Sequence, residues 1–161
     1  YPYPILAVIH LPADKKSIIA DLLNEKSEIT VKEARDKEDI KGGHMYFAPS
    51  NYHLLAEKNF SLSLSVEEPV LFSRPSIDVL FETAADAYGD RNIGILLTGA
   101  NSDGAKGLKA ISDAGGQTII QDVETAYADA MPAAGLKLVP DADVMFLEEI
   151  SEFLKSLPDA A

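Results

Sequence analysis

Compact apolar runs recur along the chain and predict the strands of a parallel sheet. Residues 5–9 and 93–97 are nearly all apolar, which is typical of strands that are buried on both faces. Residues 29–33 alternate between apolar and polar positions and predict a further strand, and residues 118–121 predict another short one. Turns or helical patterns lie between these runs, as βα units require.

A second pattern occupies the middle of the chain, where short segments alternate with period two. Pro49, Ser50 and Asn51 separate the first pair of segments, and a polar turn separates the second pair. We expect these segments to form an antiparallel meander inserted among the βα units. The three segments are residues 44–48, 52–56 and 60–65.

Helical spacing of apolar residues predicts the remaining elements. Asp14 is a suitable N-cap for a helix that continues to about residue 24. Residues 77–88 carry a clear apolar stripe, a helix follows Gly104, and residues 149–157 form a closing helix. Three segments are less regular: residues 122–131, which Pro132 interrupts, and the weak elements 136–139 and 144–147. Together these elements predict one α/β domain over residues 1–161, a three-layer, doubly wound α/β/α fold with a mostly parallel sheet.

Composition excludes several classes of function. The 161 residues contain 14 Lys and Arg against 26 Asp and Glu, and the net charge of -12 argues against binding to nucleic acid. Cysteine is absent, which excludes disulfides, thiolate metal sites and a cysteine nucleophile, and fits the cytoplasm. The three histidines show no zinc-site spacing, and no apolar run approaches the length of a membrane span. We therefore expect no metal, no cofactor and no membrane insertion.

The loop of residues 98–104 joins a predicted buried strand to a predicted helix, and such strand ends collect ligands in open α/β sheets. Its two glycines resemble the start of a phosphate-binding P-loop, but Ala105 and Lys106 stand where that motif needs Lys and then Ser or Thr. The carboxylate of Asp103 would also repel phosphate. Taken alone, the loop favours a simpler role, in which Ser102 or Asp103 caps the helix.

A second strand end carries His10, before Pro12 stops the strand. A histidine oriented by a buried carboxylate forms two thirds of a hydrolase triad, so His10 and Asp103 are candidate catalytic residues if their strands are neighbours. The alternative for His10 is a structural histidine. Arg74 either pairs with a carboxylate near the site or lies solvated at the surface, and His44 and His53 are expected to be surface or structural residues.

Several motifs, in order along nearly the whole chain, resemble the catalytic domain of the chemotaxis protein-glutamate methylesterases of the CheB type. Tyr46-Phe-Ala-Pro49 with His53 is similar to "Y-I-A-P-G-x-x-H", and Arg74-Pro-Ser-Ile-Asp78 to "R-P-S-V-D". Leu96-Leu-Thr-Gly99 through Ala105 is similar to "L-T-G-M-G-x-D-G-A". Further similarities lie at residues 9–12, 31–43, 121–122 and 131–132.

This resemblance implies a serine hydrolase that cleaves glutamate methyl esters on chemoreceptors or another signalling protein, releases methanol and, in some members, deamidates glutamine. His10 matches the general base and Asp103 its orienting acid. Ala100 matches a position whose backbone N–H helps to hold the oxyanion, and a backbone donor survives a change of side chain. Arg74 and Met131 match residues that line the cleft. The resemblance also implies a possible regulatory receiver domain as partner.

The sequence departs from the family pattern at the nucleophile. The family's serine lies in a Gly-rich "G-x-S-x-G-G" turn upstream of the histidine segment, and these residues contain no such turn; neither Ser17 nor Ser102 matches it. Ala100 and Ala130 also replace the usual Met and Gly. Two interpretations stay open, a longer polypeptide with the serine upstream or a non-catalytic binding or scaffold relative. We favour the first, because loss of a central strand would uncover a sheet edge. A nucleotide-binding α/β module is disfavoured, because no glycine motif is complete.

Overall fold

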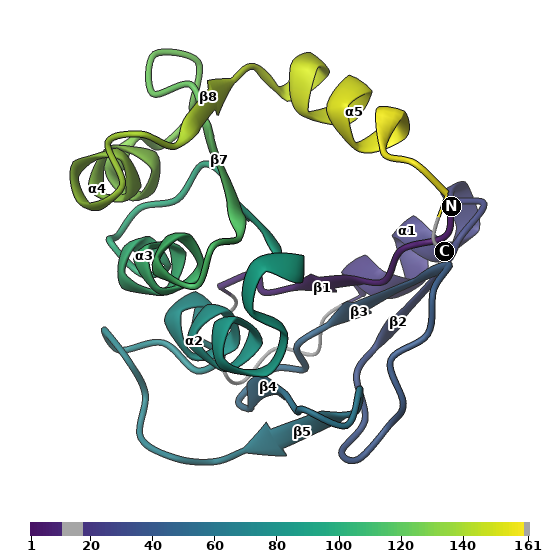
Figure 1. Cartoon of the computed structure of the whole chain (residues 1–161). Coiled ribbons are helices and arrows are strands. Elements are labelled where there is room, and N and C mark those ends of the chain that lie inside the picture. Colours follow the sequence, from purple (N-terminus) through teal and green to yellow (C-terminus); the bar gives the residue numbers. More distant parts are fainter. Residues whose placement is uncertain (11–17, 160–161) are drawn as a thin grey trace. The chain divides into compact units, whose positions relative to one another are not determined.

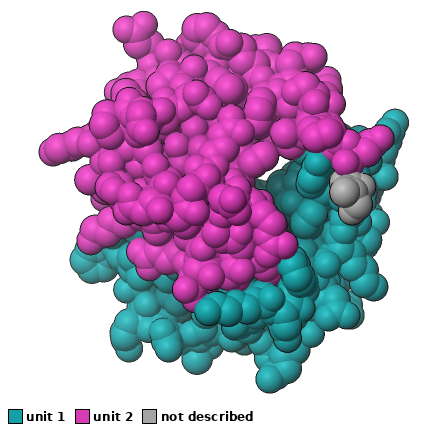
Figure 2. All heavy atoms as spheres, in the orientation of Figure 1, with its two compact units in different colours: residues 1–80, 160–161 teal, residues 81–159 magenta. Residues whose placement is uncertain are grey.

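The computed structural model describes residues 1–10 and 18–159 of the chain (Figure 1). These residues divide into two compact units, shown in different colours in Figure 2. Unit 1 comprises Tyr1–Leu80 and unit 2 comprises Phe81–Asp159. The predicted helix cap at Asp14 lies outside the described residues.

A three-stranded parallel sheet forms the centre of unit 1. Its strands are β1 (Ile5–Ala7), β2 (Thr30–Glu33) and β3 (His44–Phe47), in the spatial order β1-β3-β2. Parallel strands need crossover connections, and helix α1 (Ile19–Lys26) lies in the connection from β1 to β2, which flank β3 on opposite sides. Buried Ala20 of α1 packs in one cluster with Val31 and Phe47, which fixes the helix to the sheet.

The predicted three-stranded meander is partly wrong, because its first segment is β3, the central strand of the parallel sheet. The antiparallel insertion is a pair, β4 (His53–Ala56) and β5 (Leu62–Ser65), with Leu54 opposite Leu64. Residues 37–40 extend it, since Lys37 N–H donates to Leu62 O at 2.8 Å. Alternation of apolar and polar residues indicates that one face of a strand is more buried than the other, but it does not indicate which strands pair with it.

A second three-stranded parallel sheet forms the centre of unit 2. Its strands are β6 (Ile93–Leu96), β7 (Gln117–Gln121) and β8 (Asp143–Met145), in that spatial order. The helices are α2 (Ile77–Tyr88), whose first residues belong to unit 1, then α3 (Ala105–Asp113), α4 (Ala130–Leu138) and α5 (Leu147–Ser156). The 3₁₀ turn Gly89–Arg91 follows α2. The most deeply buried apolar side chains include Leu96, Leu108, Ile119 and Ile120.

Helix α4 corrects the prediction of an irregular segment around Pro132. The proline lies in the first turn of the helix, where backbone N–H groups have no intrahelical acceptor, so the missing N–H costs no helical hydrogen bond. The N-terminus of α3 also differs from the simple capping hypothesis. Its N-cap residue is Gly104 with φ of 98°, a left-handed conformation that glycine adopts readily and Ser102 or Asp103 would not.

Both parallel sheets leave strand edges open within the described residues. In unit 1, β1 pairs with β3 alone, and in unit 2, β6 pairs with β7 alone. Apolar side chains next to these edges are exposed, including Ile9 at 38% and Leu97 at 41%. Folded proteins usually cover such edges. Among the described residues, no helix is long and apolar enough to cross a bilayer.

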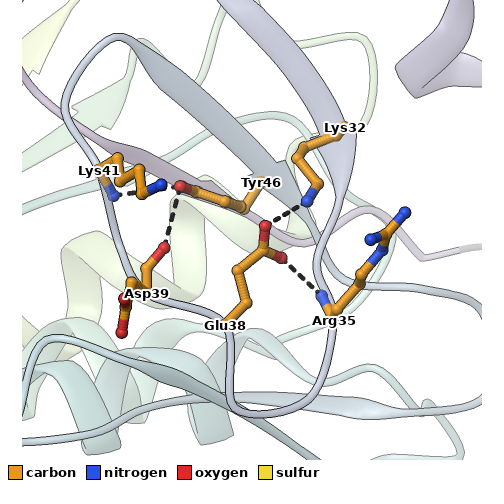
Figure 3. Close-up of polar contacts among 6 residues, drawn as sticks. All are labelled: Lys32, Arg35, Glu38, Asp39, Lys41 and Tyr46. Carbon is orange, nitrogen blue, oxygen red and sulfur yellow. Dashed lines mark hydrogen bonds and ion pairs between the residues drawn. The ribbon is translucent and has the colours of Figure 1, made fainter.

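The crossover between β2 and β3 is tied down by Tyr46, a fully buried side chain of β3 (Figure 3). Its hydroxyl accepts a hydrogen bond from Lys41 N–H at 3.1 Å and donates to Asp39 O at 3.2 Å. One buried hydroxyl therefore holds two points of the connecting loop against the sheet.

The same loop is held a second time by Glu38 (Figure 3). Its carboxylate forms an ion pair with Lys32 on β2 and accepts the N–H of Arg35 at 2.9 Å. Burial raises the pKa of the Glu38 carboxyl, but the hydrogen bonds and charges of Lys32 and Arg35 outweigh burial and hold the pKa below its usual range. A lowered pKa means that the ionised form stabilises the folded state.

Replacement of this carboxylate tests that contribution. We expect Glu38→Gln to lower the free energy of unfolding at neutral pH by about 0.5–1 kcal/mol. The loss should be complete above the unfolded pKa of about 4.3 and should vanish as pH falls through the lower folded pKa. Urea denaturation of both proteins at pH 7 and pH 3 measures the difference. Glu25→Gln, an exposed glutamate on α1, controls for net charge; an equal effect of both variants would contradict the assignment.

Candidate active site

The predicted site loop in unit 2 holds Asp103 inside the protein at the carboxyl end of β6. Asp103 has 0% of its surface exposed. Its backbone N–H donates to Asn101 Oδ1 at 3.0 Å, and Ala105 N–H donates to Ser102 O at 3.2 Å, so the chain turns tightly before α3. A carboxylate is stable at such depth when hydrogen bonds or charges compensate for lost water. The loop therefore presents an acid whose orientation the surrounding protein determines.

The start of this loop is fixed by Gln121, the last residue of β7. Gln121 is 3% exposed, and its Oε1 accepts the backbone N–H of Thr98 at 2.9 Å. The hydroxyl of Thr98 donates to Ala128 O at 3.0 Å and accepts Ala128 N–H at 2.7 Å. These bonds join the segment after β6 to the segment before α4.

Gly99 extends the junction to Met131. Gly99 N–H donates to Ala128 O at 3.0 Å, and Met131 N–H donates to Gly99 O at 3.0 Å. A Cβ atom at Gly99 would lie 2.4 Å from Met131 Cε and 2.6 Å from Sδ, so a side chain here would displace the end of Met131. Met131 is buried, whereas Ala100 is exposed. The bond to Gly99 thus ties Met131 to the loop that carries Ala100 and Asp103.

His10 lies in unit 1, three residues beyond the last residue of β1. It is half-buried and stands at the carboxyl end of a parallel strand, as the sequence predicted. Asp103 occupies the corresponding end of β6 in unit 2. The approach of His10 to Asp103 stays a prediction.

Arg74, also in unit 1, contacts carbonyl oxygens, where the sequence suggested a carboxylate partner or plain solvation. Its Nε donates to Asn51 O at 3.0 Å and Nη2 to Asn51 Oδ1 at 2.9 Å. Nη1 donates to Val66 O at 2.9 Å and to Glu67 O at 3.0 Å. The planar guanidinium holds the loop after β5 against the turn that precedes β4. The place of Arg74 beside the cleft stays a prediction.

The histidines expected to be structural have structural contacts. His53 is 1% exposed, its Nδ1 accepts Ser76 N–H at 3.2 Å and its Nε2 lies 2.9 Å from Glu68 O. Because Nδ1 is the acceptor, the ring proton belongs on Nε2. His44 Nδ1 lies 2.9 Å from Gly42 O, and its ring stacks on Tyr46. Within residues 1–10 and 18–159, no group of three His, Cys, Asp or Glu side chains is arranged to hold a metal ion.

Sequence reasoning missed the parts played by Thr98, Gln121 and Ala128. One signal was present in the sequence, since Gln121 is a polar residue that directly follows Ile119 and Ile120. In the structure it is buried. A buried amide must find hydrogen-bond partners, which makes it a candidate anchor. Ala128 carried no signal, because its backbone atoms make the contacts.

Comparison with known proteins identifies the family. A profile of the CheB methylesterase family matches residues 1–154. A protein of Leptospira interrogans named "Putative protein-glutamate methylesterase/protein-glutamine glutaminase" is 48% identical over 149 residues, which are 92% of this chain and 77% of that protein. A protein-glutamate methylesterase/protein-glutamine glutaminase of Rhodospirillum rubrum is 35% identical over 154 residues, which are 94% of this chain and 40% of that protein.

The fold comparison agrees. The crystal structure of the Thermotoga maritima CheB methylesterase catalytic domain matches with a TM-score of 0.89 and 33% identity, covering 96% of this chain and 83% of that domain. This match confirms the predicted fold class, α/β/α with mostly parallel sheets and a small antiparallel insertion. The relatives are carboxylic ester hydrolases by name. The predicted resemblance is therefore confirmed, and the chain belongs to the CheB methylesterase family.

Proposed function

We propose that this chain carries the histidine and aspartate of a protein-glutamate methylesterase. The substrate is a glutamate γ-methyl ester on a chemoreceptor or another signalling protein, the product is methanol, and glutamine deamidation is a second reaction of the same site. The fully buried Asp103, held on the loop at the carboxyl end of β6, is the observation that carries this proposal. A cytoplasmic location and regulation by a receiver domain belong to the same hypothesis.

The proposed chemistry is that of a serine-histidine-aspartate triad. A serine hydroxyl attacks the ester carbonyl carbon while His10 accepts its proton, and Asp103 accepts the other imidazole N–H and stabilises the imidazolium. The backbone N–H of Ala100 donates to the oxyanion of the tetrahedral intermediate. When the intermediate collapses, the C–O bond to the methoxy group breaks and His10 protonates the departing methanol. Water, activated by His10, then hydrolyses the acyl-enzyme to glutamate and free serine.

The nucleophile in this proposal comes from outside the 161 residues. The open edge of β1 in unit 1 and the open edge of β6 in unit 2 support that part of the hypothesis, because each edge can accept one more strand. The second candidate is a non-catalytic binding or scaffold module. It rests on the missing Gly-rich serine turn.

The catalytic roles predict large losses of rate in the natural polypeptide that carries these residues. We expect Asp103→Asn and His10→Ala each to lower kcat by about 10³–10⁴-fold, because a triad without its base or orienting acid loses general-base activation. Methanol release from a methylated receptor fragment measures the rate, with exposed Asp141→Asn as the matched control. Full activity of Asp103→Asn would refute its role. A wild-type protein that neither releases methanol nor reacts with a serine-directed fluorophosphonate would favour the scaffold hypothesis.

The packing of Met131 against Gly99 predicts coupling between two substitutions. Gly99→Ala places a methyl group against Met131 Cε and Sδ, which overpacks this contact, and we expect a loss of about 1–3 kcal/mol in unfolding free energy. Met131→Ala removes the atoms that the new methyl group meets. The double variant should therefore lose less unfolding free energy than the sum of the losses in the two single variants. Thermal denaturation of the four proteins gives the coupling energy, and strict additivity would show that Gly99 and Met131 do not interact.

The loop contacts of Arg74 predict that its replacement has a local rather than a global effect. A lysine cannot make four directed donations, so Arg74→Lys should lose about 1–2 kcal/mol of stability. Backbone amides of residues 66–73 should exchange faster with solvent, while those of α3 in unit 2 should not change. Hydrogen exchange measured by mass spectrometry distinguishes these segments. Lys137→Ala, an exposed cation on α4, is the control; equal protection of residues 66–73 in all proteins would contradict the assignment.

A further inference from the structure

The connection between β7 and α4 presents a fully exposed aromatic side chain, Tyr127, with 99% of its surface accessible. The first half of this connection is locally fixed. Asp122 Oδ1 accepts the backbone N–H groups of Glu124 at 3.0 Å and of Thr125 at 3.2 Å. The hydroxyl of Thr125 donates back to Asp122 O at 3.1 Å. The main chain is therefore ordered two residues before the tyrosine.

The second half is fixed to the candidate active site. Ala128, the residue after Tyr127, uses both of its backbone groups in the bonds to Thr98 and Gly99. Those two residues directly precede Ala100, the proposed oxyanion donor. Tyr127 thus lies between two anchors, and one of them is bonded to the loop that carries Asp103. Binding at this position would order little beyond the two side-chain torsions of the tyrosine.

The neighbours of Tyr127 in the chain cannot cover its ring. Ala126 and Ala128 flank it, and Ala130 begins α4. A tyrosine that becomes covered buries on the order of 150–250 Å², and tyrosine is enriched among the residues that dominate protein interfaces. A single exposed aromatic residue is common on protein surfaces. The bonds from the adjacent Ala128 to the site loop distinguish this one.

The negative charges near Tyr127 favour the neutral ester substrate over the acidic product. Glu124 and Asp129 are both exposed and lie three residues before and two residues after the tyrosine. Hydrolysis converts a neutral ester into a carboxylate. Two unit charges about 10 Å apart repel by about 0.4 kcal/mol in water before salt screening. Two such carboxylates therefore disfavour the product relative to the ester by a small factor.

We propose that Tyr127 is a docking residue for the protein substrate. Its ring packs against apolar side chains next to the glutamate methyl ester, and Glu124 and Asp129 favour the ester over the free acid. The inference rests on the proposed function, because it takes its substrate class from there. It adds the surface by which a macromolecular substrate is recognised next to the catalytic loop.

Binding tests this proposal without any catalytic turnover. The probes are two short fluorescein-labelled synthetic peptides that differ at one position, a glutamate γ-methyl ester flanked by apolar residues and the same peptide with free glutamate. Fluorescence anisotropy with the 161-residue chain gives both affinities. We expect the ester peptide to bind about two- to fourfold more tightly than the acid. We expect Tyr127→Ala to weaken binding of the ester by about tenfold or more.

Matched variants separate the aromatic and electrostatic parts. Tyr127→Phe keeps the ring and should restore affinity to within about threefold of wild type. The double variant Glu124→Gln/Asp129→Asn should keep affinity for the ester and lose the preference over the acid. Phe60→Ala, at an aromatic residue 51% exposed in the turn between β4 and β5 of unit 1, should bind like wild type. Unchanged melting temperatures establish that the variants are folded.

The outcomes distinguish this inference from the proposed function. Unchanged affinity of Tyr127→Ala, an equal loss in Phe60→Ala, or no binding of the ester peptide by wild type would overturn the docking role. Methanol release by the natural polypeptide decides the hydrolase proposal separately. Release of methanol without dependence of binding on Tyr127 would leave the hydrolase standing and remove the docking residue. Tyr127-dependent binding without methanol release would support the docking residue and refute the hydrolase.

Discussion

The hydrogen bond from Thr98 N–H to the buried Oε1 of Gln121 is the contact on which the candidate site depends. It fixes the chain where β6 ends, and Gln121 is itself fixed by the register of β7 against β6. From that point the hydroxyl of Thr98 and the backbone of Gly99 bind Ala128. A buried amide left without this partner would cost more than the bond contributes, so the junction is strongly specified.

Both units combine close glycine contacts, such as that of Gly42 with Pro2 O in unit 1, with polar side chains that reach across loops, such as that of Gln121 in unit 2. In unit 2, helices approach the sheet closely through glycine: a Cβ atom at Gly135 would lie 2.8 Å from a methyl group of Leu96. Gly99 permits the same closeness at Met131. In unit 1, long polar side chains reach across loops, as Arg74 and Glu38 do.

The pattern of apolar and polar residues predicted those elements that depend mainly on their own sequence. The apolar run 93–97 is observed as β6, and the stripe after Gly104 as α3. The prediction that residues 44–48 belong to an antiparallel meander was wrong, because strand pairing depends on crossover connections that a pattern of alternation does not reveal. Helix α4 was not predicted, because a proline is read as a helix breaker unless its place in the first turn is known. At the site, Asp103 and His10 were visible as polar residues at strand ends, whereas the backbone contacts of Ala128 have no signature in sequence.

The negative charge of the chain affects how strongly the proposed site binds the ester relative to the acid product. An ester approaches as a neutral group, and after hydrolysis the same side chain carries a full negative charge. A protein with a net charge of -12 repels that product weakly at long range, and salt screens the effect beyond about 10 Å. In the docking proposal, exposed Glu124 and Asp129, on the loop fixed to Thr98 and Gly99, repel the acid but not the ester, and this small difference favours release of the product.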